Sequence, residues 1–469
     1  MVVAFISLGC AKNRINTEQM MYLVKKAGHI VTGDSDGADI VVINTCGFIE
    51  SAKLEAKDII QEMLFDKKAG KIGKLIVAGC YPERYKGEIA KEFPEVNAFV
   101  GTGSFDEIVT VINNIDIAKC AENKEKHQNN NKQTYFSDIS SPVSETKRII
   151  TSSPHWTYIK IAEGCNNHCS YCCIPFIRGS FRSRSIESIV SEAKNLVNKG
   201  YNELNFIAQD LTSYGVDLYE KFSLTRLLQR LDEVEKLKWI RLLYLYPSSI
   251  DDRLIDEIAK SDKIVKYLDI PVQHVNDKIL KKMRRRYTNV EIKHLIKKLR
   301  ERIPDVVIRT SVITGLPGEG EKEFNELYEF LSQEKIERVG VFAYSPEEGT
   351  DAFLMKRPSL ETAIHRAKQV QKLQIQILDD FERSRIGTKS FVIFDGIQQE
   401  NIAEPMTNTK KHTKSFLLTR SYAEAPEVDG YILVKDELKT VKKYLNDNTA
   451  IFPVNITQYS NGTLIGELA

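Results

Sequence analysis

The sequence predicts a mixed α/β protein with three folded parts: an N-terminal parallel α/β domain, a partial TIM-like barrel of six strand–helix units, and a small OB-like β-barrel. Two stretches of alternating strand and helix patterns predict the first two parts, and short strands between turns predict the third. A chain of 469 residues is long enough for about three domains. We expect domains at 1–118, 151–384 and 385–469, with a linker at 119–150.

Buried parallel strands are expected first, at three continuous apolar runs: Val2–Leu8, Ile40–Ile43 and Leu75–Ala78. Helical segments at Asn16–Ala27 and Ser51–Lys67 separate them. A cysteine follows each run: Cys10, Cys46 and Cys80. Because the carboxyl ends of parallel strands meet at one edge of the sheet, where such folds bind ligands, we expect these cysteines to lie together.

The second part repeats the strand–helix alternation after a polar, Asn-rich stretch at Asn123–Tyr135, which we interpret as flexible linker. The helical segment Thr362–Arg385 is expected to close the barrel. In such barrels the functional groups lie at the carboxyl ends of the strands. Six runs are candidate strands: Tyr158–Ala162, Glu203–Ala208, Ile240–Tyr244, Tyr267–Ile270, Val306–Ile313 and Val339–Phe342.

The third part holds short candidate strands: Phe391–Phe394, Phe416–Leu418, Tyr431–Val434 and Ile451–Ile456. Their number and spacing suit a small β-barrel. Acidic and basic residues are nearly balanced from Lys389 to the end of the chain. A domain that grips nucleic acid is expected to carry a basic face, so this balance favours a protein substrate.

Composition narrows the class of protein. A net charge of +2 argues against a globally basic nucleic-acid coat. The chain has no run of about 18 apolar residues, as a membrane-spanning helix needs. Met1–Ser7 lacks the basic flank of a signal peptide. We therefore expect a cytoplasmic protein, in which eight cysteines favour metal or redox chemistry over disulfides.

The most informative motif is Cys165-x3-Cys169-x2-Cys172. Three thiolates on one short loop can hold three irons of a four-iron, four-sulfur cluster and leave the fourth iron open to a small molecule. A structural zinc site is the alternative, but it needs four ligands, and His168 and Cys173 lie in the same short loop. We interpret Cys173 as a packing residue.

This motif, with Tyr171 before its last cysteine, resembles the radical S-adenosylmethionine enzymes. The strings Ser7–Asn13 (SLGCAKN) and Asn44–Ile49 (NTCGFI) are similar to the N-terminal domain of methylthiotransferases, and the C-terminal barrel resembles their TRAM domain. Ala11 departs from the pattern, standing where proline is common. Four further strings resemble the RimO branch: Ile174–Gly179 (IPFIRG), Ile207–Asp210 (IAQD), Leu268–His274 (LDIPVQH) and Ala425–Gly430 (APEVDG).

The resemblance implies two [4Fe-4S] clusters, one on Cys165, Cys169 and Cys172 and one on Cys10, Cys46 and Cys80. It implies that reductive cleavage of S-adenosylmethionine generates a radical, which takes hydrogen from the β-carbon of an aspartate in ribosomal protein S-twelve. The second cluster then delivers sulfur, and a second S-adenosylmethionine provides the methyl group. No catalytic residue is assigned beyond the cluster cysteines.

Five residues are candidates for binding S-adenosylmethionine. Gln209 and Asp210 end the second barrel strand, where they bind the methionine amino group or simply cap the strand. The resemblance places Arg309, Ser311 and Gly315 near the ribose and adenine, although Gly315 is also explained by a turn.

Basic residues near the cysteine motif allow two interpretations. One arginine after the cluster loop is a candidate to pair with a carboxylate of methionine or substrate: Arg178, Arg182 or Arg184. The charge run Lys281–Arg286 (KKMRRR) is interpreted as a solvated helix face.

The expected partners are ribosomal protein S-twelve, free or in the small subunit, and an electron donor such as flavodoxin or ferredoxin. We expect a monomer. The acidic residues Glu424, Glu427 and Asp429 are expected to form a loop that steers the basic substrate. Two alternatives remain: methylthiolation of an adenosine beside the tRNA anticodon, and a non-enzymatic iron–sulfur carrier, which would not explain the six-unit barrel.

Overall fold

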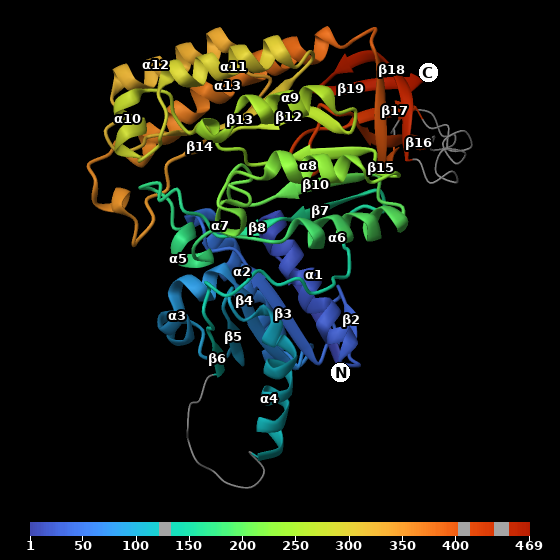
Figure 1. Ribbon diagram of the computed structural model, residues 1–469. Helices are drawn as coiled ribbons and strands as arrows, with labels where there is room; N and C mark the ends of the chain where they lie inside the picture. The colour runs from blue at the N-terminus through green and yellow to red at the C-terminus, as the bar shows by residue number, and fades with distance from the viewer. Residues whose placement is uncertain (122–132, 402–412, 436–449) are drawn as a thin grey trace, which may run out of the picture.

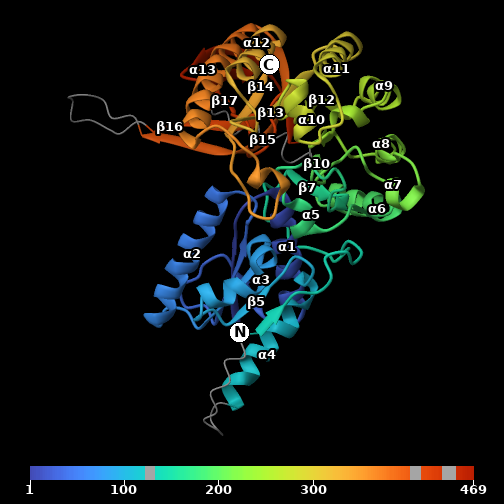
Figure 2. The same ribbon diagram turned by 90° about the vertical axis from the view of Figure 1, so that its left-hand side faces the viewer.

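The computed structural model describes residues 1–121, 133–401, 413–435 and 450–469. Two parallel sheets and one closed barrel form three folded parts, as the sequence predicts. In two perpendicular views the N-terminal domain lies below the larger barrel, and the small barrel packs beside the upper sheet (Figure 1, Figure 2). Among the described residues, no helix combines the length and the apolar character that crossing a membrane requires.

The N-terminal domain is a six-stranded parallel sheet in the order β2-β1-β3-β4-β5-β6. Its helices cover both faces, with α2 and α3 on one apolar core and α1 and α4 on the other. The strands are β1 (Val2–Ser7), β2 (Ile30–Thr32), β3 (Ile40–Thr45), β4 (Lys74–Gly79), β5 (Ala98–Val100) and β6 (Gln133–Tyr135). The helices are α1 (Ala11–Lys26), α2 (Glu50–Lys68), α3 (Cys80–Glu92) and α4 (Ile108–Ala121).

The larger barrel is an open, parallel, six-stranded sheet in the order β14-β13-β12-β11-β10-β7. Its strands are β7 (Trp156–Lys160), β10 (Glu203–Ile207), β11 (Trp239–Leu242), β12 (Ile264–Asp269), β13 (Val307–Thr314) and β14 (Arg338–Ala343). Helices cover one face: α6 (Ile186–Asn198), α8 (Leu224–Asp232), α9 (Asp252–Lys260), α11 (Asn289–Arg302), α12 (Glu321–Glu334) and α13 (Leu360–Ser384).

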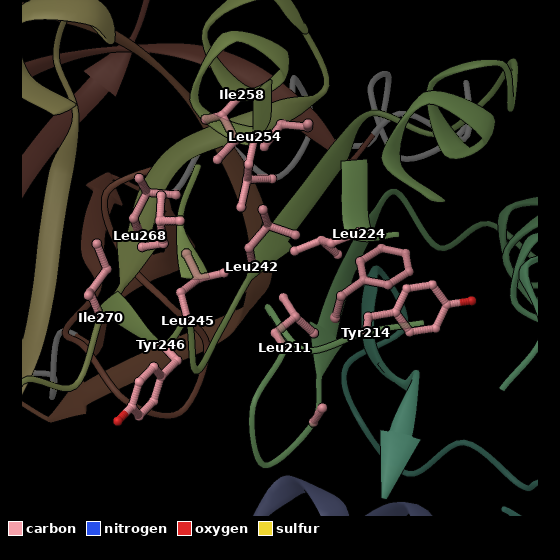
Figure 3. Packing of buried hydrophobic residues seen from close by; sticks show 14 of the residues in the cluster. Leu211, Tyr214, Leu224, Leu242, Leu245, Tyr246, Leu254, Ile258, Leu268 and Ile270 are labelled. Atoms are coloured by element: carbon pink, nitrogen blue, oxygen red, sulfur yellow. The ribbon is translucent and has the colours of Figure 1, made fainter. Parts of the chain in front are cut away.

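Leucine and isoleucine side chains fill the layer between this sheet and its helices (Figure 3). Several helices begin at capping residues. Thr288 and Glu291 form a capping box at α11, and the Asp251 side chain accepts from the Leu254 amide at α9.

Shorter elements complete the part between 151 and 384. The short strands β8 (Ala162–Glu163) and β9 (Arg182–Ser183) pair with each other. The short helices are α5 (Ile174–Arg178), α7 (Val216–Tyr219) and α10 (Asp277–Lys282). 3-10 turns occur here at Pro247–Ser249 and Asp351–Leu354, and a further one, Phe105–Glu107, precedes α4 in the N-terminal domain.

The C-terminal part is a closed barrel in the order β15-β16-β17-β19-β18. Val392, Phe452 and Val454 belong to its apolar core. Closure leaves the small barrel without free strand edges. The strands are β15 (Lys389–Asn401), β16 (Thr413–Arg420), β17 (Ile432–Lys435), β18 (Ile451–Ser460) and β19 (Thr463–Leu468).

The loop after β16 plugs the amino end of the larger barrel. Ala423 and Ala425 pack with Trp156 and Tyr158 on the sheet face opposite the helices, which we call the barrel interior. A fully buried ion pair reinforces this contact: Arg420, the last residue of β16, lies 2.8 Å from Glu203. The carboxyl end of the sheet remains directed toward the N-terminal domain.

The expectation that an acidic loop steers the substrate is wrong. Glu424 is buried and pairs with Arg338 at 2.9 Å, and Asp429 accepts a 2.7 Å hydrogen bond from Tyr267. Glu427 is partly exposed but pairs with Arg14 at 2.5 Å. These carboxylates join the small barrel to the rest of the chain.

The expected linker is only partly a linker. Residues 122–132 lie outside the described part of the chain, so the interpretation of the Asn-rich stretch there is not tested. Gln133–Tyr135 forms β6 at the edge of the N-terminal sheet. Arg148 then pairs with Glu18 at 2.5 Å, which fixes the following segment against α1.

Candidate functional site

Three cysteines lie at the carboxyl edge of the N-terminal sheet, as the strand pattern predicts. Cys10 is the N-cap residue of α1, Cys46 follows β3, and Cys80 opens α3. Cys10 is exposed, Cys46 is half-buried and Cys80 is buried. We call these residues the N-terminal triad.

Close backbone contacts hold the loops of this triad together. Gly9 has φ +87°, and a Cβ atom on it would lie 2.7 Å from Cys46 Cβ. Gly79 has φ +103°, and a Cβ atom there would lie 2.3 Å from Asn44 Oδ1. Because only glycine adopts such φ values freely and lacks the clashing atom, these two positions bring the cysteines together.

The thiols of the N-terminal triad affect one another electrostatically. Burial and the neighbouring Cys80 and Cys10 raise the pKa of Cys46 to about 12. Although Cys10 has exposed surface, the protein atoms packed around its thiol tend to raise its pKa; Lys12 and Arg178 outweigh this effect and hold the pKa below its ordinary value. The triad therefore contains one thiol whose ionisation is favoured, beside a thiol that ionises readily only when a cation offsets its charge.

The second group, which we call the barrel triad, is formed by Cys165, Cys169 and Cys172 on the loop after β8. The Cys165 amide donates to Gly179 O at 3.2 Å, and the Ser170 amide donates to Met283 O at 3.1 Å. Tyr171 packs beside the core that contains Met283. Backbone hydrogen bonds at Cys165 and Ser170 and the packing of Tyr171 thus anchor the loop.

The barrel triad has the same mutual influence. Burial, Asp210 and Cys169 raise the pKa of Cys165 to about 11, although hydrogen bonds with Asn167 oppose the rise. Burial and Cys169 also raise the pKa of Cys172. A metal ion that replaces the proton would stabilise the thiolate forms of Cys165 and Cys172.

Arg178 at the end of α5 connects the two triads. Its guanidinium is buried and donates to Cys80 Sγ at 3.1 Å and to Glu163 Oε1 at 3.3 Å. It also donates to Asn13, whose amide donates to Thr45 O at 2.8 Å. Glu163 lies two residues before Cys165, so one side chain spans the two cysteine loops.

Glu163 is the anion at the centre of this connection. Burial raises its pKa, but Lys160 and Arg178 outweigh burial and lower it to about 2. Lys160 Nζ lies 2.6 Å from Glu163 Oε2, and Gln209 Nε2 donates to Oε1 at 2.9 Å. The carboxylate stays ionised and orients the Gln209 amide.

The predicted cofactor-binding residues fall into two groups. Gln209 Oε1 is buried and has no hydrogen-bond partner among the described residues. Arg309 and Ser311 alternate along β13 as half-buried residues, and Arg309 pairs with Asp269 at 2.7 Å. These three side chains have capacity left for a ligand.

Asp210 and Gly315 have structural roles. Asp210 accepts hydrogen bonds from Thr212 Oγ1 at 2.6 Å and from Asn167 at 2.7 Å, so it caps a turn and fixes the cluster loop. A Cβ atom on Gly315 would lie 2.3 Å from Ala363 Cβ, which explains the glycine by packing against α13.

The interpretation of Lys281–Arg286 as a solvated face is wrong for one member. Arg285 is buried, lies 4.5 Å from the Tyr246 ring centroid, and donates toward Cys169 Sγ at 3.6 Å. Its neighbours Arg284 and Arg286 are exposed. The sequence shows a basic run with Tyr287 two residues after Arg285, but nothing in that pattern indicates which arginine is buried.

A basic hollow opens beside the barrel triad. We call it the basic mouth, and it also contains some acidic residues. It is lined by Asn167, His168, Asp277, Lys281, Arg284, Arg285, Arg286, Tyr287, Thr288 and Glu291. Asn167 and His168 belong to the cysteine loop itself. Arg285 lines the mouth and also donates toward Cys169 Sγ, so this single side chain connects the mouth to the thiol.

The arginines after the cluster loop differ in role. Arg184 pairs with Glu192 at 2.6 Å, and Arg182 donates to the Ser180 carbonyl at 2.5 Å. Cys173 packs in a small apolar cluster with Cys80 and Ile177, as the sequence suggested. Arg178 alone among the three arginines contacts a triad thiol in the described structure.

The donor set suits iron–sulfur clusters. Among the described residues, no three Cys, His, Asp or Glu side chains converge closely enough to hold a single metal ion. A four-iron cluster makes a different demand, because each thiolate binds its own iron. Two groups of three thiols, each beside a cation that offsets anionic charge, fit that demand.

Comparisons with known proteins agree with the geometry. Residues 159–331 match the family model described as the Radical SAM superfamily, and residues 2–101 match the Uncharacterized protein family UPF0004. The chain is 42% identical to "Ribosomal protein uS12 methylthiotransferase RimO" of Acetivibrio thermocellus, covering 99% of this chain and 98% of that protein. The protein of the same name from Caldicellulosiruptor saccharolyticus is 44% identical, over 93% of this chain and 94% of its own length.

The chain belongs to the RimO family. The family resemblance carried by the sequence motifs is thereby confirmed. A solved structure also shares the fold: the radical S-adenosylmethionine methyltransferase TsrM from Kitasatospora setae, at 12% identity and a TM-score of 0.55. That match covers 86% of this chain and 81% of TsrM. No individual role was predicted from the sequence for four residues that contact or influence the triads: Lys12, Asn13, Glu163 and Arg285.

Replacing Gly9 with Ala should destabilise the N-terminal triad. A new Cβ would meet Cys46 at 2.7 Å at a φ of +87°. Overpacking costs about 1–3 kcal/mol in addition to the φ penalty. Gly28→Ala is the matched control, since Gly28 has φ +90° with nothing within 4 Å. Denaturant unfolding should show a larger loss for Gly9→Ala, and equal losses would contradict the close-contact argument.

Proposed function

We propose that this chain is a methylthiotransferase that modifies an aspartate of ribosomal protein uS12, the S-twelve protein of the small subunit. One observation carries the proposal. In a chain of the RimO family, two cysteine triads from different domains meet at the carboxyl end of the larger barrel, where Arg178 joins them. An electron carrier has no use for two incomplete ligand sets that meet at one end of a barrel.

Each triad is proposed to hold one [4Fe-4S] cluster, with S-adenosylmethionine bound beside the barrel triad. When bound, these groups supply the radical and sulfur chemistry that no side chain provides at an unactivated carbon. The protein contributes position and a dry environment. Ile15 of α1 and the plugging residues Ala423 and Ala425 exclude water from the barrel interior.

Gln209, Arg309 and Ser311 are proposed to bind S-adenosylmethionine. The unpartnered Gln209 Oε1 accepts from the methionine amino group, because Glu163 already holds the amide nitrogen at 2.9 Å. Arg309 and Ser311 lie along β13 on the same side of that strand. Asp210 and Gly315 are proposed to shape the site through the turn and the helix contact described above.

The proposal includes the partners and the setting. The substrate is uS12, either free or in the small subunit, and the chain works as a cytoplasmic monomer. A one-electron donor such as flavodoxin or ferredoxin is required for reductive cleavage. We place its docking surface at the basic mouth, because Arg285 joins that surface to Cys169.

Cysteine variants should separate the two triads. Cys169→Ala should abolish both formation of 5′-deoxyadenosine and methylthiolation of uS12, whereas Cys46→Ala should preserve the former and abolish the latter. Each variant should retain about four irons of the eight expected from two clusters. Cys173→Ala is the matched control and should keep both clusters. Equal loss of cleavage in folded Cys169 and Cys46 variants would contradict the division.

Charge reversal at the basic mouth should affect only the protein donor. Arg284→Glu with Arg286→Glu should slow flavodoxin-driven formation of 5′-deoxyadenosine about tenfold at low ionic strength, since rim charges mainly set association rates. Dithionite-driven cleavage should not change. Lys25→Glu with Lys26→Glu, at exposed positions at the end of α1, is the control with the same charge change. A similar loss with both reductants would refute this docking surface.

A further inference from the structure

Lys12 is a buried cation without an anionic partner. It lies in the first turn of α1 and is only 7% exposed. Its Nζ atom is 3.3 Å from the centroid of the Tyr244 ring. No carboxylate lies within ion-pair distance of Lys12 anywhere in the described residues, and no described group accepts a hydrogen bond from it.

Arg285, at the mouth, is held by the Pro271 carbonyl, the Tyr287 hydroxyl and Cys169 Sγ, but four other cations near the barrel interior are paired with carboxylates. These pairs are Lys160 with Glu163 at 2.6 Å, Arg178 with Glu163 at 3.3 Å, Arg241 with Glu203 at 2.7 Å, and Arg309 with Asp269 at 2.7 Å. Burying an uncompensated charge is costly. The absence of a carboxylate at Lys12 therefore requires a reason.

The helix makes this position still more positive. Partial positive charge from the peptide dipoles gathers at a helix N-terminus, where a lysine is unfavourable. The first turn of α1 contains no acidic residue to offset it. A cation–π contact with Tyr244 compensates only part of the charge. The end of α1 is thus prepared for an anion that the chain itself does not supply.

The N-terminal triad explains only part of this charge. Lys12 lies two residues after Cys10 and contributes to lowering the pKa of that thiol. However, it is Arg178 that hydrogen-bonds a triad thiol, at 3.1 Å from Cys80 Sγ. Lys12 instead reaches across to Tyr244, just beyond the carboxyl end of β11 in the other domain. Its ammonium therefore lies at the junction of the two domains.

We propose that Lys12 binds the side-chain carboxylate of the substrate aspartate. The inference rests on the proposed function and deepens it. The carbon to be modified is bonded directly to that carboxylate, so an ammonium that fixes the carboxylate also fixes the reacting carbon between the two triads. The Tyr244 ring holds the ammonium in place and leaves its donors free, because a ring face accepts no more than a cation–π contact.

This arrangement also gives specificity for aspartate. An asparagine side chain has nearly the same shape but no charge, so it cannot compensate the buried ammonium. Truncating one member of a buried charge pair in an interface carries a large penalty. Wild-type protein is therefore expected to bind uS12 at least about 30-fold more tightly than uS12 with the target aspartate replaced by asparagine.

The test is a cycle between enzyme and substrate variants. Equilibrium binding of both uS12 forms is measured on cluster-loaded protein without reductant, for wild type, Lys12→Met and Lys12→Arg. Lys12→Met should weaken binding of natural uS12 about 30-fold or more and leave the asparagine form almost unchanged, which removes the preference. Lys12→Arg should keep most of the preference. Lys26→Met, the same change at an exposed position of α1, should behave as wild type.

Other outcomes overturn the inference. If Lys12→Met weakens both forms of uS12 equally, or loses iron while the preference for aspartate persists, Lys12 serves the triad or the fold and not the substrate. Dissociation constants report only the protein that binds, so partial loading does not obscure their ratio. If wild-type protein binds but never modifies uS12, the proposed function fails while the binding result for Lys12 still stands.

Discussion

The buried guanidinium of Arg178 is the interaction on which the arrangement of the site depends. It lies at the end of a five-residue helix in one domain and hydrogen-bonds Cys80 and Asn13 in the other, while Glu163 holds it from the barrel side. Removing either partner would leave a buried charge uncompensated, which is strongly destabilising. The two cysteine triads are therefore held in one orientation by a short polar chain.

The rest of the molecule supports this junction. The small barrel closes the amino end of the larger barrel through the ion pair between Arg420 and Glu203. The opposite, carboxyl end is the one directed toward the N-terminal domain. Acidic residues of the small barrel that a sequence reader would assign to substrate steering are used in that closure instead. Charge available to a ligand is concentrated elsewhere, at Lys12 and at the basic mouth.

Much of this was predictable from sequence. Each cysteine of the N-terminal triad follows an apolar run, and the three cysteines of the barrel triad form one local motif, so both groups could be identified without coordinates. The burial of Arg285 and Glu424 could not, because burial depends on packing between distant segments. Lys12 lies within a recognised string, but its missing partner is visible only when every neighbour is known. Short strands such as β6 were also missed, since three residues carry too little pattern.

The central claim is that the site at the junction of the two domains binds and modifies an aspartate of a protein substrate. One reaction tests it directly: cluster-loaded protein with S-adenosylmethionine, a reductant, and both uS12 and unmodified tRNA in the same vessel, followed by mass spectrometry of each. The account predicts a methylthio group on one aspartate of uS12 and none on tRNA. A methylthiolated adenosine beside the anticodon, with unmodified uS12, would contradict it.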